Sequence, residues 1–148
     1  MSGENVGLIR SICDMLPAGD FAALLDDEEA IAEVTAALEQ FVDREVEVSL
    51  FGPSYTQIRE TSRGIDGYAA LWRDWLRPFH SYRIELERMI DLGDRVLVLT
   101  RASARVEPGS PEIVNAGATI FGVREGRVTT VDSFLDRDEA LGAAGLSG

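Results

Sequence analysis

The chain has 148 residues, 45% hydrophobic and 27% charged, which is typical of a globular protein and predicts one domain spanning residues 1–148. Acidic residues outnumber basic ones by 26 to 14, giving a formal net charge of −12. Nucleic acids and anionic membranes bind clustered Lys and Arg, and no cluster is present, so neither is expected as a partner. The single cysteine, Cys13, forms no internal disulfide, and no apolar stretch is long enough for a membrane span. These features predict a cytoplasmic protein.

Apolar residues with helical spacing occupy the first third of the chain. The first predicted helix ends at residues 17–19, a short helical piece covers 20–25, and a third run extends from Ile31 to Val42. A strand is predicted over 46–51 and a shorter one over 56–60. The last long helix begins at 66–67 and carries an aromatic and aliphatic stripe that consists of Tyr68, Leu71, Trp72, Trp75, Leu76 and Phe79.

The second half of the chain alternates strand and turn. Strands are predicted over 82–90, 95–106, 113–124 and 127–135, joined by turns at 91–94, 108–111 and 125–126. Helices followed by an antiparallel meander indicate an α+β domain with the helices against one face of the sheet.

Register through these turns predicts which side chains face the helices. A row crosses the four strands at Ile84, Arg101, Ala118 and Ser133, so Ser133 points inward and Asp132 outward. The same inner face is predicted to carry Tyr82, Leu86, Leu97, Leu99, Ile120, Val131 and Leu135. A buried guanidinium needs a partner, and small residues surround Arg101, so the pattern predicts a cavity with a cationic floor.

Three aromatic residues and one histidine are further candidate site residues. Trp72 and Trp75 either pack in the core or stack on a ligand, and Tyr55 lies in a loop or lines the site. His80 either caps the last helix or lines the pocket. One His and one Cys far apart give no metal-ligand set and no catalytic triad, so neither a metal nor a cofactor is expected.

Several segments resemble the SnoaL-like branch of the nuclear transport factor 2-like superfamily. They are Arg63–Gly64 and residues 93–98, 124–128 and 134–141. The resemblance implies a cone-shaped α+β fold, with N-terminal helices packed in the concave face of a strongly bent, mostly antiparallel sheet. It also implies an apolar pocket, which Tyr55 would line, and often a dimer through the outer sheet face. Activities in the superfamily include polyketide cyclisation, epoxide hydrolysis, ketosteroid isomerisation and dehydration.

The resemblance also indicates what is missing. Limonene epoxide hydrolases of this superfamily use an arginine and two aspartates, and the matching positions here are Arg101, Ser103 and Ser133. Both carboxylates are therefore replaced by serine. The candidate catalytic residue is Arg101, and the candidate ligand-binding residues are Tyr55, Trp72, Trp75, Tyr82, Leu97, Leu99, Ser103, Ala118, Ile120 and Ser133.

Two hypotheses follow. The first is a cofactor-free pocket protein with cyclase, isomerase or dehydratase chemistry, in which Arg101 holds an acidic or enolic oxygen of a hydrophobic or amphipathic molecule. The second is a non-catalytic ligand-binding or dimerisation module. A homodimer is expected from the mixed outer face, which is predicted to carry Thr100, Thr119, Phe121, Thr130, Asp132 and Phe134.

Overall fold

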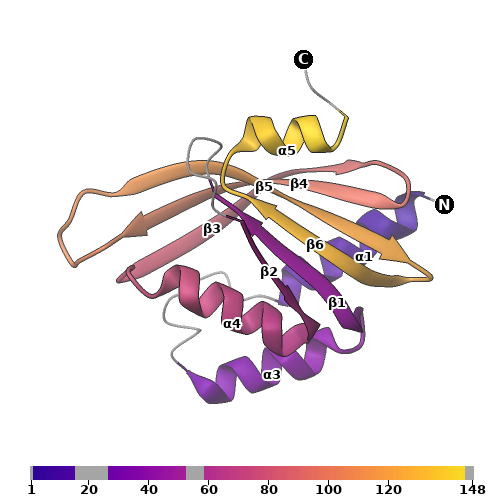
Figure 1. Cartoon of the computed structure of the whole chain (residues 1–148), viewed down its shortest axis with the longest axis horizontal. Helices are drawn as coiled ribbons and strands as arrows, with labels where there is room; N and C mark the ends of the chain where they lie inside the picture. Colours follow the sequence, from indigo (N-terminus) through magenta and orange to yellow (C-terminus); the bar gives the residue numbers. More distant parts are fainter. Residues whose placement is uncertain (1, 16–26, 53–58, 146–148) are drawn as a thin grey trace.

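The computed structural model of the protein describes residues 2–15, 27–52 and 59–145 (Figure 1). Its elements follow in the order α1 (Ser2–Met15), α3 (Glu28–Leu38), β1 (Val42–Phe51), β2 (Arg59–Arg63), α4 (Gly64–Leu76), β3 (Ser81–Asp91), β4 (Arg95–Arg105), β5 (Ile113–Arg124), β6 (Arg127–Phe134) and α5 (Arg137–Ala143). The helical piece predicted at 20–25 and the start of the strand predicted at 56–60 lie outside the described residues.

Most element predictions are confirmed within a few residues, and two are not. The helical run predicted to reach Val42 ends at Leu38, and Val42 begins β1 instead. No helix was predicted after the last strand, whereas the chain forms α5 there. The Asp136 carboxylate caps this helix by accepting from the backbone N–H groups of Asp138 and Glu139.

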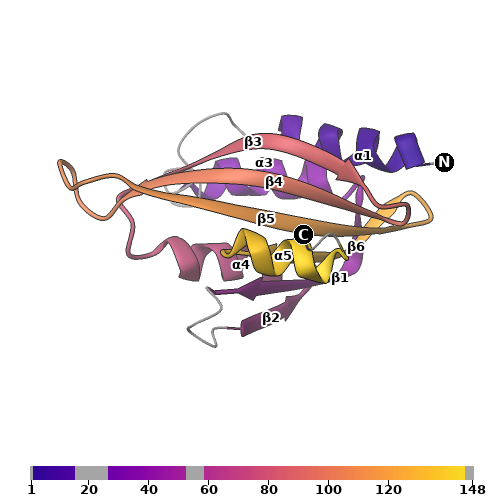
Figure 2. The same ribbon diagram turned by 90° about the horizontal axis from the view of Figure 1, so that it is seen from above.

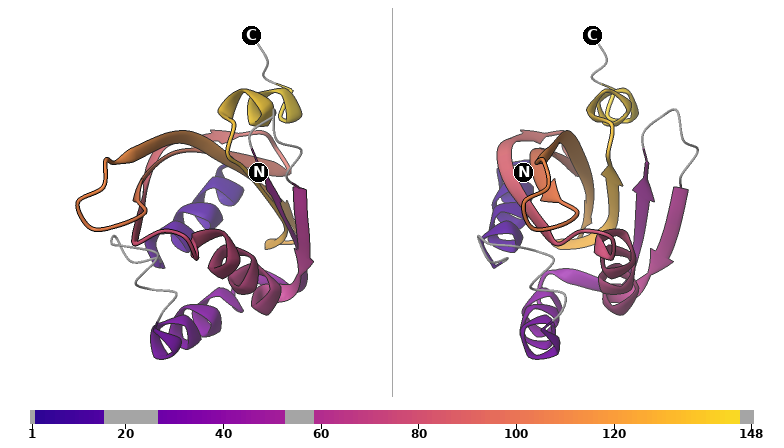
Figure 3. Two further views of the ribbon diagram at one scale, coloured as in Figure 1. Left: turned by 60° about the vertical axis from the view of Figure 1, so that its left-hand side comes forward. Right: turned by 90° about the vertical axis from the view of Figure 1, so that its left-hand side faces the viewer.

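The six strands form one sheet in the order β2-β1-β6-β5-β4-β3. Neighbouring strands are antiparallel except β1 and β6, which are parallel. Figure 3 shows that the sheet bends strongly around the helical side of the molecule. The α+β class and the bent, mostly antiparallel sheet predicted from the sequence are therefore confirmed.

Helices cover both faces of this sheet. Helices α1, α3 and α4 lie on the concave side and α5 lies on the convex side (Figures 1 and 2). The concave core joins Ile9 and Ile12 of α1 to Val48, Val98 and further residues of the strands. A second core, beneath α5, consists of Leu97, Ala118, Ile120, Phe134, Ala140 and Ala144. Strands between these layers are buried on both sides, as β4 shows at Val96, Leu97 and Val98.

Two β-bulges set which residues face the concave side. In β3 the pairing with β4 shifts between Leu86 and Arg88, so Glu87 is the extra residue. In the β5–β6 pair the shift leaves Thr129 as the extra residue, because Gly122 pairs with Thr130 and Val123 with Val128. A bulge of one residue interrupts the alternation along its strand, so every residue beyond it faces the side opposite to that expected from uninterrupted alternation.

The predicted register fails in all three strand pairs: in the β3–β4 and β5–β6 pairs, which contain the bulges, and in the β4–β5 pair, where Ile113 pairs with Ala104 and there is no bulge. The 125–126 hairpin is correct, since Arg124 pairs with Arg127, but Ser133 pairs with Thr119 rather than with Ala118. On the other side, Arg101 pairs with Ala116 and Glu85, not with Ala118 and Ile84. The inner-face assignments hold for β3 and β6 and are reversed for β4 and β5.

Candidate functional site

A cavity of about 430 Å³ lies between the concave face of the sheet and helices α1, α3 and α4. The residues that line it are mostly aliphatic. Those described are Ile12, Cys13, Asp14, Ile31, Val34, Thr35, Leu38, Val42, Ile65, Tyr68, Ala69, Trp72, Ile84, Leu86, Val98, Thr100, Thr119, Phe121, Val128 and Val131.

Helix α4 supplies the aromatic wall of the cavity. Tyr68, Ala69 and Trp72 fall on one face of this helix, because residues three and four apart lie above one another. The Trp72 ring meets Tyr82 edge-on, with 6.3 Å between ring centroids, and Tyr82 in turn packs against Phe79 at 5.3 Å. Tyr82 is buried and does not line the cavity, so it supports Trp72 from behind rather than contacting the space itself.

The Tyr68 hydroxyl and the Cys13 thiol are the titratable groups on the buried side of the cavity. Burial raises the pKa of Tyr68 to about 12, outweighing the lowering effect of its hydrogen bond with the Trp72 side chain. Burial also raises the pKa of the Cys13 thiol, and the charge of Asp14 raises it further. Both groups are therefore protonated at neutral pH. Tyr68 is suited to donate a hydrogen bond, and Cys13 is not a thiolate nucleophile.

Hydroxyl groups mark the sheet wall of the cavity. Thr100 pairs with Gly117 across β4 and β5, and Thr119 lies two residues further on, so both threonines project from the concave face. The Thr119 hydroxyl lies 3.4 Å from that of Ser133, which is buried. Gly117, which pairs with Thr100, is closely approached by the backbone of β6. A side chain there would begin 2.8 Å from the Phe134 carbonyl oxygen.

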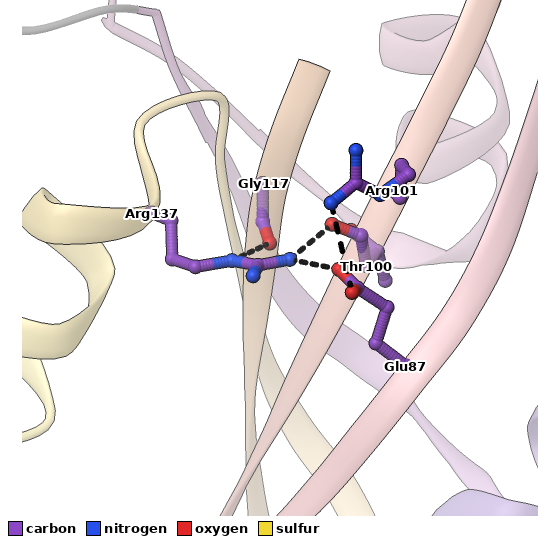
Figure 4. A network of polar contacts seen from close by, with 5 residues as sticks. All are labelled: Glu87, Thr100, Arg101, Gly117 and Arg137. Carbon is purple, nitrogen blue, oxygen red and sulfur yellow. Dashed lines mark hydrogen bonds and ion pairs between the residues drawn. The ribbon is translucent and has the colours of Figure 1, made fainter. Parts of the chain in front are cut away.

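The prediction that Arg101 lies in the pocket is wrong. Its side chain is 49% exposed on the convex side, where a guanidinium nitrogen lies 3.9 Å from a carboxylate oxygen of Glu87 (Figure 4). Glu87 also accepts a hydrogen bond from Arg137, which donates to the carbonyl oxygens of Thr100 at 2.7 Å and Gly117 at 3.3 Å. The hydrogen bond from Arg137 lowers the pKa of Glu87. Arg101 thus belongs to a network that holds α5 on the sheet.

The other predicted site residues are distributed over both faces. Trp72 lines the cavity, and Ser133 faces the same side as predicted, touching it only through Thr119. Ser103 lies two residues from Arg101 on the convex side of β4, and His80 is exposed away from the cavity. The Trp75 and Tyr55 side chains lie outside the described residues. Those found in or against the core beneath α5 are Leu97, Leu99, Ala118 and Ile120.

Sequence reasoning missed the polar groups of the cavity. Tyr68 was assigned only to the apolar stripe of its helix, and Thr100 and Thr119 were assigned to the outer face. A signal for the bulges was available, because buried Val128 and Val131 stand three residues apart where strand alternation requires two. The same spacing separates Leu86 from Met89 in β3, and both bulges could have been inferred from it.

The described part of the chain contains no group of His, Cys, Asp and Glu side chains able to hold a metal ion. None of its helices combines the length and apolar character needed to cross a membrane.

Comparison with known proteins identifies the family to which this fold belongs. The model of the SnoaL-like domain matches residues 22–131. The fold is similar to a candidate SnoaL-like polyketide cyclase from Jannaschia sp. CCS1, with 16% identity over 90% of this chain and 85% of that one and a TM-score of 0.61. An NTF2-like protein of unknown function from Burkholderia pseudomallei K96243 is also 16% identical, over 93% and 95% of the two chains, with a TM-score of 0.60.

Bal32a, from a soil-derived mobile gene cassette, is another similar structure, with 16% identity over 89% of this chain and 88% of that one and a TM-score of 0.60. None of the curated proteins matches the chain significantly. The fold defines an NTF2-like protein, a class that includes ligand-binding and cyclase- or isomerase-type members. The chain belongs to the SnoaL-like domain family.

Proposed function

We propose that this protein binds a small, largely apolar molecule in the cavity between the sheet and helices α1, α3 and α4. The observation that supports this most directly is the nature of the walls: a space of about 430 Å³ whose lining is mainly aliphatic and aromatic. Small-molecule sites in proteins are concave, apolar spaces of about 300–1,000 Å³ with a few polar groups that orient the ligand. Tyr68, Thr100 and Thr119 are such groups.

The test is a pair of neighbouring substitutions in α4. Ala69 lines the cavity and Ala70, the next residue, is exposed. Ala69→Phe places a ring in the cavity, whereas Ala70→Phe adds the same ring to the surface. The neutral dye Nile red is expected to show enhanced emission with the unmodified protein and with Ala70→Phe, and to bind Ala69→Phe at least tenfold more weakly.

Circular dichroism and urea unfolding establish that both variants are folded. If Ala69→Phe distorts the helix, the smaller Ala69→Leu takes its place and should weaken binding by a smaller factor. Equal binding of Nile red to folded Ala69→Phe and Ala70→Phe would contradict the proposal, because the dye would then bind elsewhere.

A second candidate function is acid–base chemistry of the cyclase, isomerase or dehydratase type in the same cavity. The observation that favours it is that Asp14, an exposed residue, and Tyr68 are both among the residues that line the cavity. A carboxylate can remove a proton while a neutral tyrosine stabilises the developing enolate oxygen by a hydrogen bond. Once a ligand is known, turnover that is lost in both Asp14→Asn and Tyr68→Phe supports this function. Unchanged turnover in either variant would refute it.

A further inference from the structure

The cavity contains little charge to meet a charged ligand. Asp14 is the one ionisable group among its described lining residues that is charged at neutral pH, given the raised pKa values of Cys13 and Tyr68. All fourteen basic residues of the chain are arginines, and none of them is among the described lining residues.

The described arginines lie outside the cavity lining, and each is either exposed or bound to a backbone carbonyl oxygen. Three are half-buried, and each donates to a backbone carbonyl: Arg95 to Ala143, Arg105 to Ser110 and Arg137 to Gly117. The arginines that are exposed are Arg10, Arg44, Arg63, Arg73, Arg77, Arg83, Arg88, Arg101, Arg124 and Arg127. The side chain of Arg59 lies outside the described residues. Segments 16–26 and 53–58, also outside them, contain no Arg, Lys or His in the sequence.

The charged residues that act on the Cys13 thiol, which lies on the α1 side of the cavity, are Asp14 and Arg10. Besides burial, the charge of Asp14 raises the pKa of this thiol and the charge of Arg10 lowers it, and the effect of Asp14 is the larger of the two. The Asp14 carboxylate disfavours an anion beside Cys13, in a protein whose overall charge of −12 adds to the same effect.

The uncharged polar groups suit a different ligand. The hydroxyls of Thr100, Thr119 and Tyr68 can each donate or accept one hydrogen bond, as carbonyl, hydroxyl and amide groups require. Thr100 and Thr119 come from neighbouring strands, β4 and β5, and both line the sheet wall of the cavity. A carboxylate brought to the same wall would give up its hydration without a cation in return, which is strongly unfavourable in an apolar site.

We infer that the cavity takes uncharged apolar molecules that carry a carbonyl, hydroxyl or amide group, and that it rejects carboxylates of the same shape. This inference rests on the proposed binding function and reverses the ligand expected from the sequence, an acidic molecule held by Arg101. It follows from where the arginines lie and which hydroxyls remain on the sheet wall.

The experiment compares two probes of nearly identical size, 2-naphthamide and 2-naphthoate, by isothermal titration calorimetry at pH 8. We expect the amide to bind at least about 30-fold more tightly than the carboxylate, because only the latter loses hydration without a partner. Ala69→Phe serves as the check on location and should weaken the amide.

Charge substitutions in α1 give the matched control. Both residues are exposed: Asp14→Asn removes a carboxylate from a residue that lines the cavity, and Glu4→Gln removes one from the first turn of the same helix, outside the lining. Asp14→Asn should strengthen the binding of 2-naphthoate relative to that of 2-naphthamide about three- to tenfold at low salt. Glu4→Gln should change neither, although it alters the net charge equally.

The outcomes separate the two proposals. Equal affinity for amide and carboxylate, or equal responses of 2-naphthoate to Asp14→Asn and Glu4→Gln, would overturn the inference while leaving a ligand-binding cavity in place. Absence of 2-naphthamide binding, or amide binding that Ala69→Phe does not weaken, would overturn the proposed function and this inference with it.

Discussion

Replacing Arg137 by methionine should show how strongly the convex network holds the fold. The methionine keeps an apolar stem of similar length but removes the hydrogen bonds to the carbonyl oxygens of Thr100 and Gly117 and to Glu87. Each hydrogen bond to a backbone carbonyl contributes about 0.5–1.5 kcal/mol net. The two therefore amount to about 1–3 kcal/mol of unfolding free energy, or a fall in Tm of about 2–12 °C for a domain of this size.

Urea unfolding followed by circular dichroism measures this change, with Arg77→Met as the control. Arg77 pairs with Asp74 at 2.9 Å, but the two side chains are 75% and 64% exposed. An exposed pair of this kind is worth about 0.5 kcal/mol or less. If Arg137→Met costs no more than Arg77→Met, the network does not anchor α5 and the reasoning fails.

The dependence of stability on pH gives a second test of the network, because Arg137 is the main cause of the lowered pKa of Glu87. A carboxylate whose pKa is lower in the folded state stabilises the fold above its ordinary pKa and loses that contribution as the pH falls through the folded value. The stability difference between the unmodified protein and Arg137→Met should therefore narrow as the pH falls below the ordinary value of 4.5. It should not vanish, since the carbonyl contacts do not titrate. A difference that stays constant into this range would mean that Glu87 contributes nothing.

Three further predictions concern the cavity wall, the bent sheet and assembly. Thr119→Val, which keeps the shape and removes the hydroxyl, should weaken 2-naphthamide about two- to tenfold by calorimetry, and Thr61→Val on exposed β2 should not. Gly117→Ala should lower the free energy of unfolding in urea by about 1–3 kcal/mol, because its Cβ would lie 2.8 Å from the Phe134 carbonyl oxygen. The control is Gly7→Ala in α1, whose Cβ meets nothing within 4 Å and which should stabilise the protein. The homodimer stays a prediction, now without the outer-face argument, since Thr100, Thr119 and Phe121 line the cavity; light scattering that gives a monomer mass at micromolar concentration would remove it.

Elements and fold class could be predicted from the sequence because local signals specify them. Helical spacing located α1, α3 and α4, and the turn at Glu125–Gly126 fixed one hairpin, where both residues adopt the positive φ angles that such a turn requires. Helix α5 was not found, because a run of seven residues is too short for periodicity to distinguish it from a capped turn.

The faces of β4 and β5 were predicted wrongly, for two physical reasons. The bulges at Glu87 and Thr129 each shift the pairing by one residue, and turn geometry alone cannot reveal them. In addition, α5 covers the convex face, so alternation of apolar and polar residues no longer separates inside from outside. Leu97 and Val98 are adjacent and both buried, one beneath α5 and one in the concave core.

The error over Arg101 follows from that second reason and bears on function. Leu97 and Leu99 suggested a core-facing row, and Arg101 continues the same row on the same side of β4; the row does face a core, but it is the one beneath α5. The concave side of this strand instead presents Val98 and Thr100. Thr100 therefore serves both sides of the sheet. Its carbonyl oxygen, like that of Gly117, accepts a hydrogen bond from Arg137 on the convex side, and its side chain lines the cavity on the concave side. A strand held in this way cannot move outward to admit a larger ligand without displacing α5. The position of Thr100 in the cavity wall is thus set in part by a helix on the opposite face of the sheet.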